Sequence, residues 1–161
     1  MLFYDYITSP LGEIELCVND EGLVSVLFVE TKKQTIIKKE KAQHPLLTET
    51  SKQLYAFFKN DLQQFDLPFS LTGTDFQKKV WDQLTKINYG KTISYLELAK
   101  QLGDEKCIRA AAAANGKNPI GIIIPCHRVI GSSGKLVGYA GDLSRKKSLL
   151  ELEGAYHDLF S

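Results

Sequence analysis

The sequence predicts an α+β fold made of two parts that meet near Gly73. Before this residue, three candidate strands are separated by short turn sequences, and after it helical periodicity dominates. The charge changes sign there too, because residues 1–73 hold 7 basic and 10 acidic side chains and residues 74–161 hold 13 and 9. These observations predict an N-terminal α/β sheet domain over residues 1–73 and a C-terminal, mainly helical domain over residues 74–161, whose positive charge suits a polyanion.

Length and composition are those of an ordinary globular protein, with 161 residues, 43% hydrophobic and 24% charged. The longest apolar run, around residues 121–125, is far shorter than the ~20 residues of a membrane-spanning helix, and the first residues lack the basic start of a signal peptide. The three cysteines, with His44, His127 and His157, show neither disulfide nor zinc-ligand spacing. We therefore expect a cytoplasmic, intracellular protein with no metal and no membrane partner.

The N-terminal part has the pattern of an antiparallel meander. Two turn sequences, at residues 10–12 and 20–22, separate three β-prone stretches at residues 3–8, 13–19 and 23–29. An amphipathic helix is predicted over residues 46–59, and an extended stretch over residues 65–71.

Two capping boxes mark helix starts in the C-terminal part. Gln77 follows Thr74 by three residues, and Glu97 follows Ser94, so helices are predicted to begin at Thr74 and Ser94. A Gly-containing turn after the second of them leads into another short helix over residues 105–115. This pair predicts a helix-turn-helix.

The second helix of that pair carries an unbroken alanine run at residues 110–114. One interpretation is a good helix former packed against a crowded core. The other is a helix slim enough for the minor groove of B-form DNA, which is only ~6 Å wide. The residues alone leave both open.

An apolar segment follows and leads into a polar one. Residues 122–124 predict a buried strand, and the irregular segment 125–131 places polar groups directly after it. Beyond a Gly- and Ser-rich loop, Asp142 is expected to cap a last helix that Gly154 ends.

Cys126 is the candidate nucleophile. A cysteine attacks as the thiolate, and a cysteine beside a histidine and an arginine, after a rigid proline, is where a depressed thiol pKa is expected. The other two cysteines lack such neighbours and are predicted to be buried apolar residues. His127 needs a bridging water or a local twist to act on Cys126, because adjacent residues of extended chain face opposite ways. Glu151 and Glu153 are both candidates to hold its ring.

The chain resembles the O6-alkylguanine-DNA alkyltransferases in one specific segment, Ile124 to Ile130, which reads IPCHRVI and follows Asn118-Pro119. The first 73 residues match mainly in arrangement, which implies a ribonuclease H-like sheet domain. The resemblance implies a DNA repair methyltransferase that moves the alkyl group of O6-alkylguanine, and by extension of O4-alkylthymine, onto its own cysteine. It uses no cofactor and acts once per molecule. Further matches lie at residues 89–95, at Arg109 with its alanine run, and at residues 138–141 and 149–154.

The resemblance also implies roles for single residues. Cys126 is the alkyl acceptor, His127 the base that acts through a water, and Glu153 the carboxylate that orients His127, while Asn118 shapes the turn before the acceptor. Tyr95 offers its hydroxyl to the guanine ring, and Arg109 enters the base stack. The residues implied to contact DNA or line the base pocket are Tyr95, Arg109, Ala110, Arg128, Val129, Tyr139 and Ala140.

The implied partner is double-stranded DNA, met by a monomer in the minor groove with the alkylated base flipped out. An alkyl group on a base edge inside a duplex cannot meet a sulfur in line unless the nucleotide is extruded. Two residues depart from the family pattern. Gly121 stands where many relatives have a proline and predicts a looser loop that admits bulkier adducts. Ala140 stands where some relatives have a serine, so only its backbone amide can donate to the base.

Three other functions compete with this one. A non-catalytic alkyltransferase-like lesion-binding protein would flip the base without taking the alkyl group, but those relatives lack the acceptor cysteine. A cysteine hydrolase built on Cys126, His127 and Glu153 would need an oxyanion hole, for which the sequence shows no motif. A helix-turn-helix regulator would need base-reading side chains, which the alanine run does not offer.

Overall fold

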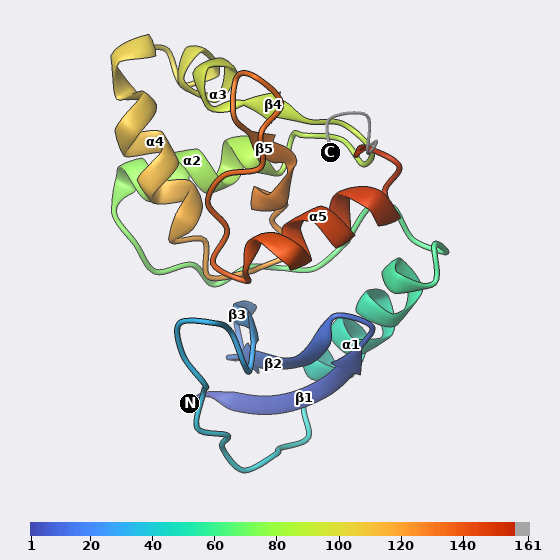
Figure 1. Ribbon diagram of the computed structural model, residues 1–161. Coiled ribbons are helices and arrows are strands. Elements are labelled where there is room, and N and C mark those ends of the chain that lie inside the picture. Colours follow the sequence, from blue (N-terminus) through green and yellow to red (C-terminus); the bar gives the residue numbers. More distant parts are fainter. Residues whose placement is uncertain (157–161) are drawn as a thin grey trace. The chain divides into compact units, whose positions relative to one another are not determined.

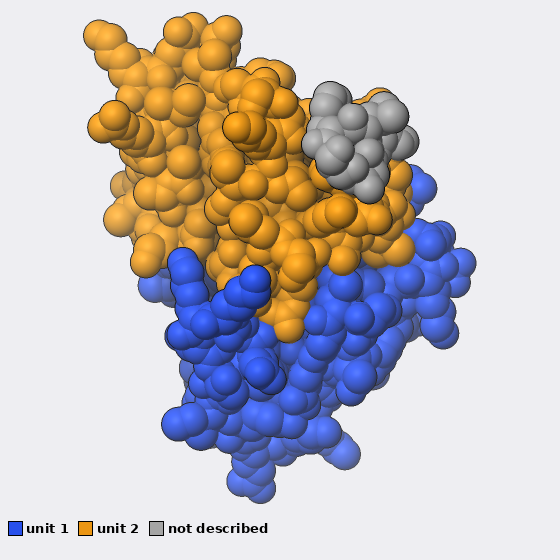
Figure 2. All heavy atoms as spheres, in the orientation of Figure 1, with its two compact units in different colours: residues 1–72, 119–123 blue, residues 73–118, 124–161 orange. Residues whose placement is uncertain are grey.

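The computed structural model describes residues 1–156, which form two compact units (Figure 1). Unit 1 comprises Met1–Thr72 and Pro119–Ile123, and unit 2 comprises Gly73–Asn118 and the chain from Ile124 onward (Figure 2). The sequence did not predict the excursion of Pro119–Ile123 into unit 1. Within residues 1–156, each helix is too short or too polar to span a bilayer.

Unit 1 contains an antiparallel sheet that confirms the predicted meander. Its strands are paired in the order β1-β2-β3 and comprise β1 (Phe3–Ser9), β2 (Gly12–Val18) and β3 (Leu23–Phe28). The expected extended stretch runs along β3, where the Leu23 amide donates to the Pro68 carbonyl at 2.8 Å. The excursion does the same, since the Val26 amide donates to the Pro119 carbonyl at 2.9 Å.

Helix α1 (Pro45–Phe58) packs on β1 and β2 and lies within one residue of its predicted bounds. Its start is capped by His44, whose Nδ1 accepts from the Leu46 amide at 3.1 Å. The core of unit 1 includes Ile14, Leu16, Cys17, Val18, Leu23, Leu47, Leu54 and Phe57.

Unit 2 is mainly helical, so the predicted α+β fold is confirmed. Its elements are α2 (Asp75–Leu84), β4 (Ile93–Ser94), α3 (Tyr95–Gln101), α4 (Ile108–Gly116), β5 (Val129–Ile130), α5 (Leu143–Leu152) and the 3₁₀ turns η1 (Glu105–Cys107) and η2 (Cys126–Arg128). The capping box before α2 is confirmed, because Thr74 and Gln77 exchange side-chain-to-backbone hydrogen bonds at 3.0 Å. Helix α4 packs on α2 and α3, and the Trp81 indole of α2 donates to the Ala114 carbonyl at 2.9 Å.

Helices α3 and α4 are the two short helices predicted for the helix-turn-helix, joined through Gly103 and η1. The alanine run divides between two environments. Ala111 and Ala114 are buried, whereas Ala110 and Ala113 are exposed. The buried alanines confirm close packing on one side of α4, and the exposed ones leave the other side with little side-chain bulk.

Residues 122–124 do not form the predicted strand. Ile122 has a φ of 69°, and the Ile123 amide donates to the Gly121 carbonyl, so the chain turns here. All three isoleucines are buried, and hydrophobicity alone does not separate a buried turn from a buried strand. Gly121 is held rather than loose, because its amide donates to the Val26 carbonyl at 2.9 Å, a bond that proline cannot make.

Candidate active site

A tight turn places Cys126 at the start of η2. Pro125 has a φ of −81° and a ψ of 63°, and the Cys126 amide donates to the Ile124 carbonyl at 2.8 Å, which is an inverse γ-turn. The proline ring holds φ near this value, so the local sequence favours the turn. All three residues of η2 are buried, and His127 is 0% exposed.

Asn118 stabilises the turn from the chain before it. Its buried Nδ2 donates to the Ile124 carbonyl at 2.8 Å, the same oxygen that accepts from Cys126. The side chain thus holds the turn that precedes Cys126.

Glu153, just after α5, holds both polar residues that follow Cys126. Its Oε2 lies 2.7 Å from His127 Nε2 and 2.9 Å from Arg128 Nη2, and its Oε1 accepts from Arg128 Nε at 2.8 Å. Burial raises the pKa of Glu153, but the hydrogen bonds from His127 and Arg128 outweigh burial and hold it at about 2. The carboxylate is therefore ionised at neutral pH. Of the two carboxylates that the residues left open, Glu153 makes the contact, and Glu151 is exposed.

The contact with Glu153 determines which nitrogen of His127 can act as a base. We assign the ring proton to Nε2, because that nitrogen faces an ionised carboxylate, and this leaves the lone pair on Nδ1. His127 Nδ1 is buried and has no hydrogen-bond partner within residues 1–156. Burial lowers the pKa of His127, and Glu153 opposes this only in part, so the ring is neutral at neutral pH.

The thiol of Cys126 does not have the depressed pKa that the sequence predicted. Burial raises its pKa, and the hydrogen bond from Asn118 and the charge of Lys146 offset burial only in part. A thiolate in the interior loses its hydration, and these neighbours do not replace it. The resting protein therefore holds a neutral thiol, which must lose its proton during a reaction.

Lys146 is a buried cation that the sequence analysis did not select. Its Nζ donates to the carbonyls of Val129 at 2.6 Å, Val137 at 2.8 Å and Gly138 at 3.2 Å. One ammonium group thus connects β5 with the far end of the loop that follows it. Burial lowers the pKa of Lys146 to about 8. A signal was present, because Lys146 shares the buried side of α5 with Leu149 and Leu150.

Two tyrosines interact electrostatically with Cys126. Tyr95, the first residue of α3, donates from its hydroxyl to the Val137 carbonyl at 3.0 Å. Burial and then the charge of Cys126 raise the pKa of Tyr95, and the same two causes raise the pKa of Tyr139 well above its usual value. Both phenols are therefore neutral and can donate hydrogen bonds.

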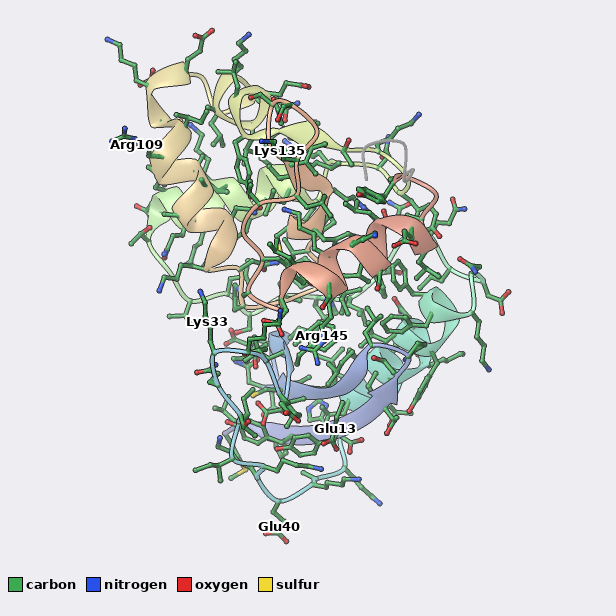
Figure 3. All side chains as sticks on the ribbon, viewed as in Figure 1. Glu13, Lys33, Glu40, Arg109, Lys135 and Arg145 are labelled. Atoms are coloured by element: carbon green, nitrogen blue, oxygen red, sulfur yellow. The ribbon has the colours of Figure 1, made fainter. Side chains whose placement is uncertain are left out.

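The other expected contact residues occupy different surroundings. Arg109 and Ala110 are exposed on α4, and the Arg109 side chain extends away from the helix (Figure 3). Val129 is buried and presents its carbonyl to Lys146, whereas Ala140 is exposed.

Arg128 lies elsewhere than expected for a residue that contacts DNA. It is 6% exposed, Nε and Nη2 bind Glu153, and Nη1 donates to the Ile87 carbonyl at 2.7 Å. A guanidinium can form two parallel hydrogen bonds with a carboxylate. This pairing with the buried Glu153 keeps the Arg128 guanidinium in the interior. Arg128 therefore fixes the position of the Glu153 carboxylate.

No group of three His, Cys, Asp or Glu side chains within residues 1–156 is arranged to hold a metal ion. His157, considered as a ligand from the sequence, lies outside the described residues.

Two family profiles match the chain and together cover most of it. The profile described as "6-O-methylguanine DNA methyltransferase, ribonuclease-like domain" matches residues 2–71. The profile described as "6-O-methylguanine DNA methyltransferase, DNA binding domain" matches residues 75–155.

Individual relatives match over nearly their whole length. A methylated-DNA–protein-cysteine methyltransferase of Methanosarcina acetivorans is 44% identical over 155 residues, which cover 96% of this chain and 99% of the relative. The crystal structure of Mycobacterium tuberculosis O6-methylguanine methyltransferase matches with a TM-score of 0.84 and 42% identity, over 99% of this chain and 96% of the other. Mycobacterium tuberculosis OGT in complex with DNA matches with a TM-score of 0.85 and 43% identity, over 95% and 93%.

Proposed function

Because this chain belongs to the 6-O-methylguanine DNA methyltransferase family, whose members repair DNA, we propose that its Cys126 sulfur takes the alkyl group of O6-alkylguanine, once per molecule. The observation that carries this proposal is the buried His127 ring. Glu153 occupies its Nε2, and its Nδ1 has no partner among the described residues and can take up a proton. A thiol with a raised pKa needs such a base at the moment of attack.

The reaction moves one alkyl group and one proton. A water between Cys126 and His127 Nδ1 passes the thiol proton to the ring, and the Glu153 carboxylate stabilises the imidazolium that forms. The sulfur attacks the alkyl carbon, the S–C bond forms, and the C–O6 bond breaks. The departing guanine takes a proton on a ring nitrogen from the Tyr95 hydroxyl, and the Tyr95 oxygen recovers a proton from the His127 imidazolium through water. The thiol proton thus ends on guanine, and both residues return to their neutral forms. The resulting thioether is not hydrolysed, so each molecule reacts once.

DNA is the partner of this chain, and α4 is the element that we propose enters the minor groove. Its exposed alanines, Ala110 and Ala113, add little bulk, and Arg109 extends from the same helix. The flipped base would leave a gap in the stack that Arg109 can fill. All residues of this site come from one chain, which supports a monomer as the active form.

A count of lesions repaired per protein molecule tests the proposal. The protein is mixed with excess duplex carrying one O6-methylguanine, and the unmodified guanine that forms is measured until the reaction stops. We expect one lesion repaired per molecule, and none with Cys126→Ala. Continued turnover would instead indicate a hydrolase, and lesion-selective binding without repair would indicate a non-catalytic lesion-binding protein. A duplex with O4-methylthymine measures whether the pyrimidine lesion is also a substrate.

A further inference from the structure

Asn115, near the end of α4, has a buried side-chain amide of which only the nitrogen makes a hydrogen bond within residues 1–156. The side chain is 3% exposed, and its Nδ2 donates to the Cys126 carbonyl at 3.4 Å. Its Oδ1 is also buried and has no hydrogen-bond partner within residues 1–156. A buried acceptor without a donor costs free energy, so a polar group left in this state calls for a partner.

The orientation of this amide follows from its neighbour. If the nitrogen and oxygen were exchanged, Oδ1 would face the Cys126 carbonyl, and two acceptors would oppose each other. The orientation with Nδ2 toward Cys126 is therefore the favourable one, and Oδ1 is the atom left without a partner.

The amide of Asn115 lies beside the proposed acceptor residue, because its Nδ2 contacts the Cys126 carbonyl. The same amide acts on Tyr95 as well, because a hydrogen bond from Asn115 lowers the pKa of Tyr95 against the larger, raising effect of burial. The two polar atoms of an amide are bonded to the same carbon. The unused Oδ1 therefore lies close to both the acceptor residue and the tyrosine.

We propose that Asn115 Oδ1 accepts a hydrogen bond from the 2-amino group of the alkylated guanine and so determines the preference of this site for guanine. Both nitrogens of the six-membered guanine ring flank the carbon that carries this amino group. A guanine whose ring nitrogen meets the Tyr95 hydroxyl thus brings its amino group next to Asn115. O4-alkylthymine has a carbonyl oxygen in the corresponding place, and that oxygen would oppose Oδ1. This inference rests on the proposed transfer to Cys126.

The test compares two lesions that differ only in the amino group. Wild-type protein and Asn115→Leu are reacted with duplexes carrying O6-methylguanine or O6-methylhypoxanthine, and the transfer rate constants are measured. We expect the wild type to react about tenfold faster with O6-methylguanine, the discrimination that one hydrogen bond supplies. In Asn115→Leu we expect this ratio of rate constants to fall toward one. We also expect the variant's rate constant on O4-methylthymine to rise relative to its rate constant on O6-methylguanine. Any difference in base pairing between the duplexes cancels when the two proteins are compared.

Two results would overturn the role of Asn115: equal wild-type rates on the two purine lesions, or an unchanged ratio in the variant. The first needs no variant, so the inference stays testable if Asn115→Leu does not fold. Trp81 fluorescence reports on folding at this site, because its indole binds the carbonyl of the neighbouring Ala114. Failure of the wild type to methylate Cys126 with any lesion would contradict the proposed function instead.

Discussion

Each unit of this protein buries a cysteine and a glutamate, yet only unit 2 combines them with a base. In unit 1, Cys17 is 1% exposed, and Glu15 accepts a hydrogen bond from the Tyr6 hydroxyl at 2.9 Å. In unit 2, the buried carboxylate of Glu153 instead accepts from His127, the residue next to Cys126. Burial raises the pKa of both cysteines.

The difference shows that burial alone does not make a cysteine reactive in this protein. A buried thiol has a raised pKa wherever it lies, because the thiolate loses its hydration. What distinguishes Cys126 is the neutral imidazole of the adjacent His127. Glu153 binds its Nε2, and its Nδ1 has no hydrogen-bond partner among residues 1–156.

The largest expected effect comes from removing each buried cysteine in turn. Cys126→Ala is expected to abolish alkyl transfer, because Cys126 is the one cysteine that a histidine follows in the sequence, and Glu153 holds that histidine. Cys17→Ala is the matched change in unit 1, and its transfer rate is expected to stay within about twofold of the wild-type rate. It should lower the free energy of unfolding only by the amount expected for the loss of one buried apolar atom. Single-turnover repair of an O6-methylguanine duplex measures both. Residual transfer by Cys126→Ala would contradict the assignment.

Removing the charge of each buried glutamate gives the next largest effect. Glu153→Gln is expected to slow transfer by roughly 10²–10⁴-fold, because the amide does not stabilise the imidazolium that forms on His127. Glu15→Gln is the control, and its transfer rate should match that of the wild type. Equal losses in the two variants would mean that the effect is general destabilisation. Urea unfolding of both proteins measures that contribution separately.

The low pKa of Glu153 predicts a loss of stability in acid. Its folded-state pKa of about 2 lies below the ordinary 4.5, so the stabilisation is fully present above pH 4.5 and is lost as the pH falls toward 2. A shift of this size corresponds to about 3 kcal/mol in the free energy of unfolding. Urea unfolding at pH 6 and pH 3 should therefore show a gap between wild type and Glu153→Gln that narrows in acid. A gap of constant size would refute the assigned pKa.

The smallest expected effect concerns the capping box at the start of unit 2. Thr74→Ala removes the acceptor of the Gln77 amide and should lower the free energy of unfolding by about 1 kcal/mol. Transfer should be unchanged, because Thr74 takes no part in the active site. Thermal unfolding, with Thr48→Ala in the exposed part of α1 as the control, measures the cost. A loss of transfer without a loss of stability would show that α2 does more than support the fold.

Local signals predicted most of the fold. The meander, α1 and the capped start of α2 all depend on residues close in sequence, and the structure confirms them. The turn at Ile122 was missed because its residues are buried and apolar, as a strand's would be. Val26, whose carbonyl accepts from the Gly121 amide just before Ile122, lies far away in the sequence.

Of the site, the sequence itself predicted the candidate nucleophile, Cys126. The resemblance to a family supplied the roles of the other residues. Spacing could not choose between Glu151 and Glu153, and the raised pKa of Cys126 depends on burial, which no local pattern gives. The resemblance implied that Arg128 contacts DNA, but in the structure a buried carboxylate binds it. Asn115 and Lys146 were missed because their partners are carbonyls brought together by folding.

Mapping the methyl group onto the cysteines tests the central claim most directly. After complete reaction with an O6-methylguanine duplex, the protein is digested, and the peptides that contain Cys17, Cys107 and Cys126 are quantified by mass spectrometry. We expect one methyl group per molecule, all of it on Cys126. A methyl group on Cys17 or Cys107, or an unmodified Cys126 after the lesion has been repaired, would contradict the role assigned to Cys126 and His127.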